Sequence, residues 1–104
     1  MLNLLKLCAG QLRRYTLLPP KIMLLAQISD LQVMPKGELA YGRVDTASML
    51  RNAIEHLNRL DPQPDVVLIT GDLADKGQRT AYAHLREILA KLKAPYYVIP
   101  GNHD

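Results

Sequence analysis

Residues 66–72 read Val-Val-Leu-Ile-Thr-Gly-Asp, and this stretch decides the fold class. Its first four residues form a short apolar run, three of them β-branched, which is typical of a strand in the interior of a parallel sheet. A buried helix would need a run of roughly ten residues or more, and Gly71 and Asp72 end this run much sooner. We therefore predict a buried strand over 66–69 that is followed at once by a polar loop.

Two further apolar runs lie on either side of this strand along the chain, at residues 22–28 and 96–99. The first is Ile-Met-Leu-Leu-Ala-Gln-Ile, which predicts a strand buried on both faces. Apolar residues at three- and four-residue spacing indicate an amphipathic helix between each pair of strands. The first helix carries Val44, Ala47, Leu50, Ile54 and Leu57, and the second carries Tyr82, Leu85, Ile88, Leu89 and Leu92.

The limits of the first helix are also marked in the sequence. Asp45 can cap its amino terminus, and the segment 61–65, Asp-Pro-Gln-Pro-Asp, ends it. The resulting order is β-α-β-α-β, which predicts an α/β fold with a parallel sheet and right-handed crossovers.

Length and composition narrow the class of protein. A chain of 104 residues has the size of one domain, and 48% hydrophobic with 22% charged residues is a globular composition. The longest strictly apolar run is 22–26, whereas a membrane span needs about 20 residues, so we expect no contact with a membrane. The single cysteine, Cys8, cannot form an internal disulfide, which favours a reducing compartment, the cytoplasm.

The positive charge belongs to one end of the chain. Residues 1–22 contain four basic residues and no acid, whereas residues 23–104 contain nine basic and ten acidic residues. The body therefore lacks the basic surface that a nucleic acid needs, and we expect no nucleic-acid partner. Residues 1–21 are interpreted as a basic, poorly ordered extension or a start-site artefact ahead of Met23. Their leucines could form a short amphipathic helix ended by Pro19 and Pro20.

Each predicted strand is followed by an oxygen donor: Asp30 after the first, Asp72 after the second and Asn102 after the third. Parallel strands present their carboxyl ends at one edge, so these three residues should converge there. Two adjacent carboxylates repel each other unless a cation or a proton lies between them, which favours a divalent metal. Gly71 and Gly101 fit such loops, since they allow positive φ or close backbone approach. A single Gly-Asp is more often a turn or a helix cap; the matching positions of three loops favour the metal site.

Residues 22–104 resemble the calcineurin-like metallophosphoesterase superfamily, and most closely its bacterial class III cyclic-nucleotide phosphodiesterase and glycerophosphodiesterase branch. The resemblance is carried by Ile28-Ser29-Asp30-Leu31-Gln32, by Gly71-Asp72 and by Gly101-Asn102-His103-Asp104. Residues 39–45, Leu-Ala-Tyr-Gly-Arg-Val-Asp, also resemble that branch. The resemblance implies that residues 22–104 are a truncated domain of this type, the N-terminal half of a four-layer αββα sandwich.

The resemblance also implies a function and roles for individual residues. The family hydrolyses phosphodiesters with a metal-activated hydroxide at two divalent ions of the Fe, Mn, Zn or Mg class. A cyclic nucleotide or a glycerophosphodiester is the implied small-molecule substrate. By the resemblance Asp30 would ligate the first metal, Asp72 would bridge both and Asn102 would ligate the second. His103 would stabilise the phosphoryl oxygens or protonate the leaving alkoxide.

Two departures from the family pattern lead to a second hypothesis. The family has Asp-x-His in its first motif, and here Gln32 replaces the histidine with a weaker amide oxygen. The family's other histidine ligands come from a second half that we expect this chain to lack. We therefore predict weak metal binding, no efficient turnover by residues 1–104 alone and exposed apolar faces that favour self-association. The alternative is a catalytically inactive, truncated or degenerate α/β module.

The remaining histidines are not expected to replace the missing ligands. His84 falls on the polar face of the second predicted helix, which predicts a solvated surface position. His56 lies in the middle of the first helix, away from the strand ends, and is expected on the helix surface or partly buried.

Overall fold

The computed structural model of the chain describes the backbone of residues 2–8 and 22–104, and the side chains from residue 22 onward. Its elements are β1 (Leu2–Cys8), β2 (Ile22–Ser29), α1 (Thr46–Arg59), β3 (Val66–Gly71), α2 (Arg79–Leu89) and β4 (Tyr96–Pro100). The strands form one sheet in the order β1-β2-β3-β4. β2, β3 and β4 are mutually parallel, which confirms the predicted β-α-β-α-β order.

The prediction of an amphipathic helix near the amino terminus is wrong for residues 2–8. These residues form β1, which pairs antiparallel with β2 from Leu2 opposite Ile28 to Cys8 opposite Ile22. β2 is the first strand of the parallel set, so without β1 its outer backbone groups would lack ladder partners, and pairing satisfies them. Residues 9–21, with the proposed stop at Pro19 and Pro20, lie outside the described residues.

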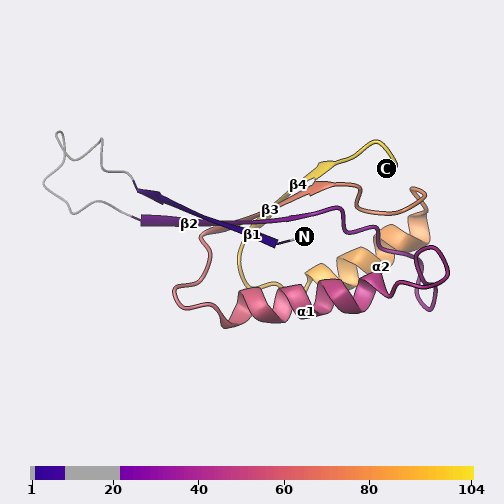
Figure 1. The fold of residues 1–104 in the computed structure, drawn as a ribbon, viewed down its shortest axis with the longest axis horizontal. Helices are drawn as coiled ribbons and strands as arrows, with labels where there is room; N and C mark the ends of the chain where they lie inside the picture. The colour runs from indigo at the N-terminus through magenta and orange to yellow at the C-terminus, as the bar shows by residue number, and fades with distance from the viewer. Residues whose placement is uncertain (1, 9–21) are drawn as a thin grey trace, which may run out of the picture.

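Both helices lie on the same side of the sheet (Figure 1). On that side Ala26 and Ile28 of β2 and Val67 and Ile69 of β3 are fully buried. The helices contribute most of the rest of the core, including Leu50, Ile54, Leu57, Leu85, Ile88 and Leu89. Each fully buried leucine, isoleucine or valine contributes about 1.5–3 kcal/mol to stability, so this layer is the main source of folding energy.

The other face of the sheet carries no helix in the described part of the chain, and this corrects one expectation. Residues 22–28 predict a strand buried on both faces, but Ile22 and Met23 are 58% and 40% exposed. All five residues of β4 are exposed, with Tyr97 at 66% and Ile99 at 58%. These strands therefore carry more apolar surface than the described residues cover.

The helices begin and end close to the predicted positions. Asp45 caps α1: its carboxylate accepts hydrogen bonds from the Ser48 backbone N–H at 3.0 Å and the Ser48 hydroxyl at 2.7 Å. Val44, expected on the apolar face, lies before this cap and is 40% exposed. Leu92, expected on α2, follows the end of that helix but is buried in the core.

Candidate functional site

The loops that follow β2, β3 and β4 lie at one edge of the sheet because these strands are parallel and in register (Figure 1). Asp30 directly follows β2, and Asp72 directly follows β3. Residues 101–104, Gly-Asn-His-Asp, directly follow β4. All of the predicted ligand positions are therefore on the carboxyl edge of the sheet.

The first two loops are joined by backbone hydrogen bonds that continue the sheet beyond its strands. The Asp30 N–H donates to the Thr70 carbonyl at 3.0 Å, and the Gln32 N–H donates to the Asp72 carbonyl at 3.0 Å. The Asp72 N–H in turn donates to the Asp30 carboxylate, with 3.4 Å between nitrogen and Oδ1. The structure thus places the Asp30 carboxylate directly beside Asp72.

Glycine is needed at the end of β3 and at the start of the third loop because the two carboxylates occupy the adjacent space. A Cβ on Gly71 would collide with Oδ1 of Asp30 and lie 2.9 Å from its Cγ. A Cβ on Gly101 would collide with Oδ1 of Asp72 and lie 2.7 Å from the Asp72 nitrogen. Gly71 also has a φ of +76°, which favours glycine. The close approach that the sequence predicts at both glycines is therefore present, and positive φ occurs at Gly71 alone of the two.

The third loop reaches the second through His103. Its backbone N–H donates to Oδ1 of Asp72 at 3.1 Å, and its Nδ1 lies 3.1 Å from the carbonyl oxygen of Asp75. Since a carbonyl oxygen only accepts, Nδ1 carries the proton, and Nε2 is the ring atom left for other partners. Asn102 is exposed between Gly101 and His103; within residues 22–104 no hydrogen bond joins its side chain to either aspartate. The described contacts therefore bring Asp30, Asp72 and the His103 backbone together, and chain connectivity places Asn102 beside them.

Two residues of the first loop have a left-handed backbone, an arrangement that is uncommon outside glycine. The φ of Asp30 is 53° and that of Gln32 is 46°. Such residues occur preferentially at functional sites, where surrounding bonds hold them in place. Here the Gln32 N–H is bonded to Asp72, and its carbonyl oxygen accepts from the Thr46 hydroxyl at 3.0 Å. The position of Gln32 is thus held through its backbone, and its side chain is half-buried.

Asp104 has a role at this edge that reasoning from the sequence did not assign. Its carboxylate accepts hydrogen bonds from the backbone N–H groups of Leu73, Ala74 and Gly101 at 2.8–3.2 Å. The Tyr82 hydroxyl donates to the same carboxylate at 2.9 Å. Desolvation opposes ionisation, but these hydrogen bonds prevail and hold the pKa of Asp104 below its ordinary value. The only feature of the sequence that pointed to a role for Asp104 was its position at the end of Gly-Asn-His-Asp.

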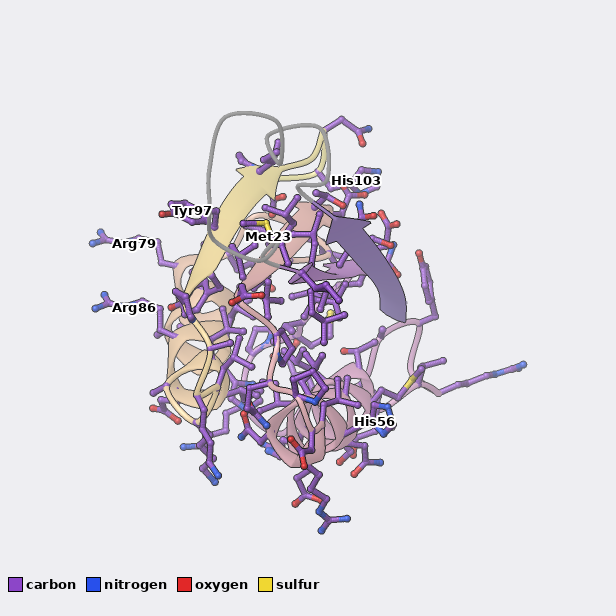
Figure 2. All side chains as sticks on the ribbon, turned by 90° about the vertical axis from the view of Figure 1, so that its left-hand side faces the viewer. Met23, His56, Arg79, Arg86, Tyr97 and His103 are labelled. Atoms are coloured by element: carbon purple, nitrogen blue, oxygen red, sulfur yellow. The ribbon has the colours of Figure 1, made fainter. Side chains whose placement is uncertain are left out.

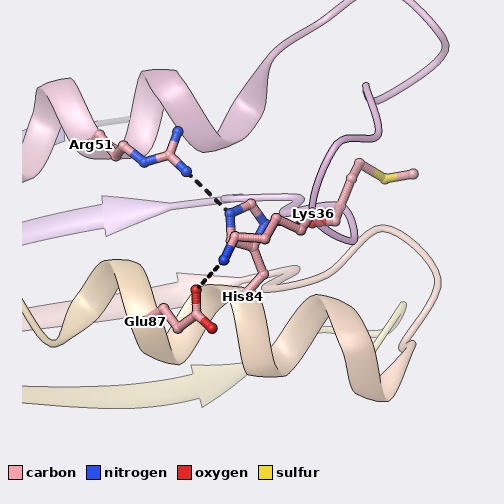
Figure 3. A network of polar contacts seen from close by, with 5 residues as sticks. Lys36, Arg51, His84 and Glu87 are labelled. Carbon is pink, nitrogen blue, oxygen red and sulfur yellow. Dashed lines mark hydrogen bonds and ion pairs between the residues drawn. The ribbon is translucent and has the colours of Figure 1, made fainter.

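The prediction that His84 is solvated is wrong. His84 is 6% exposed and lies between α2 and α1, where Nδ1 is 3.0 Å from the Met34 carbonyl oxygen and Nε2 is 3.2 Å from the Arg51 guanidinium (Figure 3). The Met34 oxygen can only accept, so Nδ1 is protonated and Nε2 accepts from Arg51. Over this histidine Lys36 pairs with Glu87 at 3.0 Å, which lowers the pKa of Glu87. Loop 33–45 folds back over the polar face of α2, and this contact between distant segments buries the ring.

His56 is exposed on α1, as predicted, and lies in the helical layer, whereas His103 lies at the sheet (Figure 2). His56 therefore has no part in the carboxyl edge.

The donor set at the carboxyl edge fits part of a divalent-metal site. Asp30 and Asp72 supply two carboxylates at the ends of neighbouring strands, and Asn102 and Gln32 are placed in neighbouring loops where amide oxygens could be added. Carboxylate and amide oxygens are ligands that Mg²⁺ and Mn²⁺ accept. In the described part of the chain, however, no three His, Cys, Asp or Glu side chains are arranged to hold a metal ion. The residues present thus suit hard cations but form an incomplete set.

Comparison with known proteins agrees with this arrangement. Residues 23–104 match the family model described as calcineurin-like phosphoesterase. A probable glycerophosphodiester phosphodiesterase of Arcobacter nitrofigilis is 46% identical over 82 residues, which are 79% of this chain and 30% of that protein. A cAMP/cGMP dual specificity phosphodiesterase of Mycobacterium tuberculosis is 39% identical over 84 residues, 77% of this chain and 26% of that protein.

A 3',5'-cyclic adenosine monophosphate phosphodiesterase of Pseudomonas aeruginosa is 34% identical over 82 residues, 79% of this chain and 30% of that protein. The matched region therefore spans 26–30% of the length of these curated relatives. Neither α1 nor α2, the helices in the described part of the chain, has the length and apolar character that a membrane span requires. The match over residues 23–104, together with the parallel α/β fold, shows that this chain belongs to the calcineurin-like phosphoesterase family.

Proposed function

We propose that this chain supplies the first part of a site that hydrolyses a phosphodiester of small-molecule size, of the cyclic-nucleotide or glycerophosphodiester type. The observation that carries the proposal is the contact between the Asp30 carboxylate and Asp72 at the end of two parallel strands. Three relatives of 34–46% identity are named as phosphodiesterases, which supports this substrate class. A single cysteine in the whole sequence supports a reducing compartment such as the cytoplasm.

Oxygens of Asp30, Asp72 and Asn102 would hold two divalent cations of the Fe, Mn, Zn or Mg class, with Gln32 as an additional weak donor. When bound, such cations polarise the phosphodiester and supply the attacking nucleophile at neutral pH. His103 of this chain would supply the proton transfer. Nδ1 of His103 is occupied by the Asp75 carbonyl, so Nε2 is the atom that can approach a phosphoryl oxygen. In its protonated form His103 would donate from Nε2 to that oxygen or to the departing alkoxide.

Binding of Mn²⁺ alone tests the first part of the proposal. Because a ligand that binds only the folded state raises its stability, millimolar Mn²⁺ should raise the urea midpoint of the chain. Asp72→Asn should abolish this rise, since it replaces the central carboxylate with an isosteric amide. A chain whose unfolding is unaffected by Mn²⁺, Mg²⁺ and Zn²⁺ would contradict the metal site.

Gln32 gives a second test. Gln32→His restores an imidazole at the end of the first strand and should tighten Mn²⁺ binding if this side chain faces the cations. Gln63→His is the matched control, because Gln63 lies just before β3, at the opposite edge of the sheet. An unchanged affinity in Gln32→His would show that this side chain points elsewhere.

We expect the 104-residue chain alone to show no efficient turnover of bis(p-nitrophenyl) phosphate with Mn²⁺. Two carboxylates with amide oxygens hold cations loosely, and no imidazole from residues 22–104 other than His103 lies at the carboxyl edge. Clear metal-dependent hydrolysis by the purified chain would refute this expectation.

A second candidate function is a catalytically inactive α/β module. The specific observation that favours it is Gln32, which replaces the histidine of the family's first motif. Such a module would show no stabilisation by cations, so the Mn²⁺ experiment distinguishes the two candidates.

A further inference from the structure

The carboxylate of Asp104 is saturated by donors from the protein itself. Its two oxygens receive three backbone N–H groups, from Leu73, Ala74 and Gly101, and the hydroxyl of Tyr82. An ionised carboxylate has about four lone-pair positions, so four donors leave no capacity for a cation. Asp104 is therefore unsuited to be a metal ligand, although it lies two residues from Asn102.

The donors belong to residues next to the proposed ligands. Leu73 directly follows Asp72, and Gly101 directly precedes Asn102. One carboxylate thus joins the backbone beside one proposed ligand to the backbone beside another, across a sequence separation of about thirty residues. The hydrogen bonds of Asp104 thus connect the second and third loops, in addition to the bond from the His103 N–H to the Asp72 carboxylate.

Tyr82 connects the Asp104 carboxylate to the helical layer. Its hydroxyl lies 2.9 Å from Oδ1 of Asp104 and 3.3 Å from the Asp104 carbonyl oxygen, and its ring packs against the core. Gly77 allows this packing, because a Cβ there would lie 3.2 Å from the carbonyl oxygens of both His103 and Asp104. The third loop thus contacts residues 73–82, which include the start of α2.

We propose that Asp104 and Tyr82 are positioning residues that hold the loop of Asp72 and the loop of Asn102 and His103 at the spacing a divalent cation requires. The inference rests on the proposed function and adds to it two residues that do not touch the cation. Hydrogen-bond partners that orient metal ligands typically change metal affinity about 10- to 100-fold when they are replaced.

The test is the affinity of the chain for Mn²⁺ alone, measured from the paramagnetic broadening of its ¹⁵N-labelled amide signals. Asp104→Asn should weaken Mn²⁺ binding about 10- to 100-fold, because an amide nitrogen then faces the backbone N–H groups. Tyr82→Phe keeps the half-buried ring and loses a single donor, so it should weaken binding by a smaller factor. The amides of Leu73, Ala74 and Gly101 should exchange with solvent faster in Asp104→Asn.

A matched control separates positioning from general stability. Ile54→Val removes one methylene from a buried side chain of α1 in the helical layer, and it should lower stability without changing the affinity for Mn²⁺. If the native chain binds Mn²⁺ and both Asp104→Asn and Tyr82→Phe bind it equally well, the inference is overturned and the proposed function survives. If Asp104→Asn does not fold, an affinity in Tyr82→Phe equal to that of the native chain overturns it. If the native chain binds no Mn²⁺, the proposed function fails and the inference falls with it.

Discussion

Replacing Gly71 with alanine tests how closely the Asp30 carboxylate packs against the end of β3. An added Cβ would collide with Oδ1 of Asp30 and lie 2.9 Å from its Cγ and 3.2 Å from its backbone nitrogen. Carbon atoms in favourable contact are about 3.5–4.0 Å apart, so the Asp30 side chain must move by roughly 0.6–1 Å. Its backbone cannot follow freely, because the Asp30 N–H is bonded to the Thr70 carbonyl.

Two physical effects contribute to the expected loss of stability. The φ of Gly71 is +76°, and a left-handed alanine costs about 1–2 kcal/mol relative to glycine. Inserting a methyl group into occupied space costs about 1–3 kcal/mol more. Gly71→Ala should therefore lower the free energy of unfolding by about 2–5 kcal/mol.

The assay is urea unfolding followed by circular dichroism. Gly42→Ala is the matched control, because Gly42 has a φ of +66° but no atom within 4 Å of the added Cβ. Gly42→Ala should lower the free energy of unfolding only by the cost of a left-handed alanine, about 1–2 kcal/mol. In the double variant with Asp30→Ala the collision with the carboxylate disappears and only the 3.2 Å contact with the backbone nitrogen remains, so up to about 1–3 kcal/mol of the Gly71→Ala effect should be recovered.

Equal losses in Gly71→Ala and Gly42→Ala would refute the reasoning. So would additive effects of Asp30→Ala and Gly71→Ala, because additivity means that the two side chains do not meet. If Gly71→Ala does not fold, the Asp30→Ala background still reports on the contact.

Three further predictions concern other parts of the chain. The Asp45 carboxylate has a lowered pKa because the Ser48 backbone N–H and hydroxyl donate to it. Its stabilisation of α1 is therefore complete above pH 3.8 and is lost as the pH falls through the lower pKa of the folded state. The urea midpoints of the native chain and Asp45→Asn should converge on acidification, and a difference that stays constant down to pH 2 would contradict this. His84→Leu leaves the buried Met34 carbonyl without its donor and should lower the stability measured by thermal unfolding by about 1–3 kcal/mol. His56→Leu, on the exposed side of α1, should change stability by less than about 0.5 kcal/mol. Equal effects of the two substitutions would mean that the His84 contacts contribute nothing to stability. Tyr97 and Ile99 expose apolar surface on β4, so replacing both with lysine should reduce self-association in sedimentation velocity; an unchanged distribution of species would exclude this strand as the contact.

Local sequence determined the parallel elements of the fold. The apolar run at 66–69, the three- and four-residue spacing of Leu50, Ile54 and Leu57, and the cap at Asp45 are short-range patterns, and each reflects the energetics of one element. The position of Asp30 and Asp72 directly after their strands follows from the same patterns, because parallel strands end at one edge.

The sequence could not show the pairing of residues 2–8 with β2, the burial of His84 or the four donors on Asp104. Each of these depends on segments that are far apart along the chain. β1 forms because β2 has an open backbone edge, and His84 is buried because loop 33–45 folds back over α2. A residue's own neighbours in sequence carry no information about such contacts.

The sequence by itself thus determined which residue types reach the carboxyl edge: two aspartates, an asparagine, a histidine and a glutamine. The tertiary structure decided how close they come, with the Asp72 nitrogen 3.4 Å from Asp30 and the third loop held by Asp104 rather than by Asn102. The reason is that strand order and chain direction place a residue at an edge, whereas its distance to a neighbour is set by the packing and hydrogen bonding of whole elements against one another.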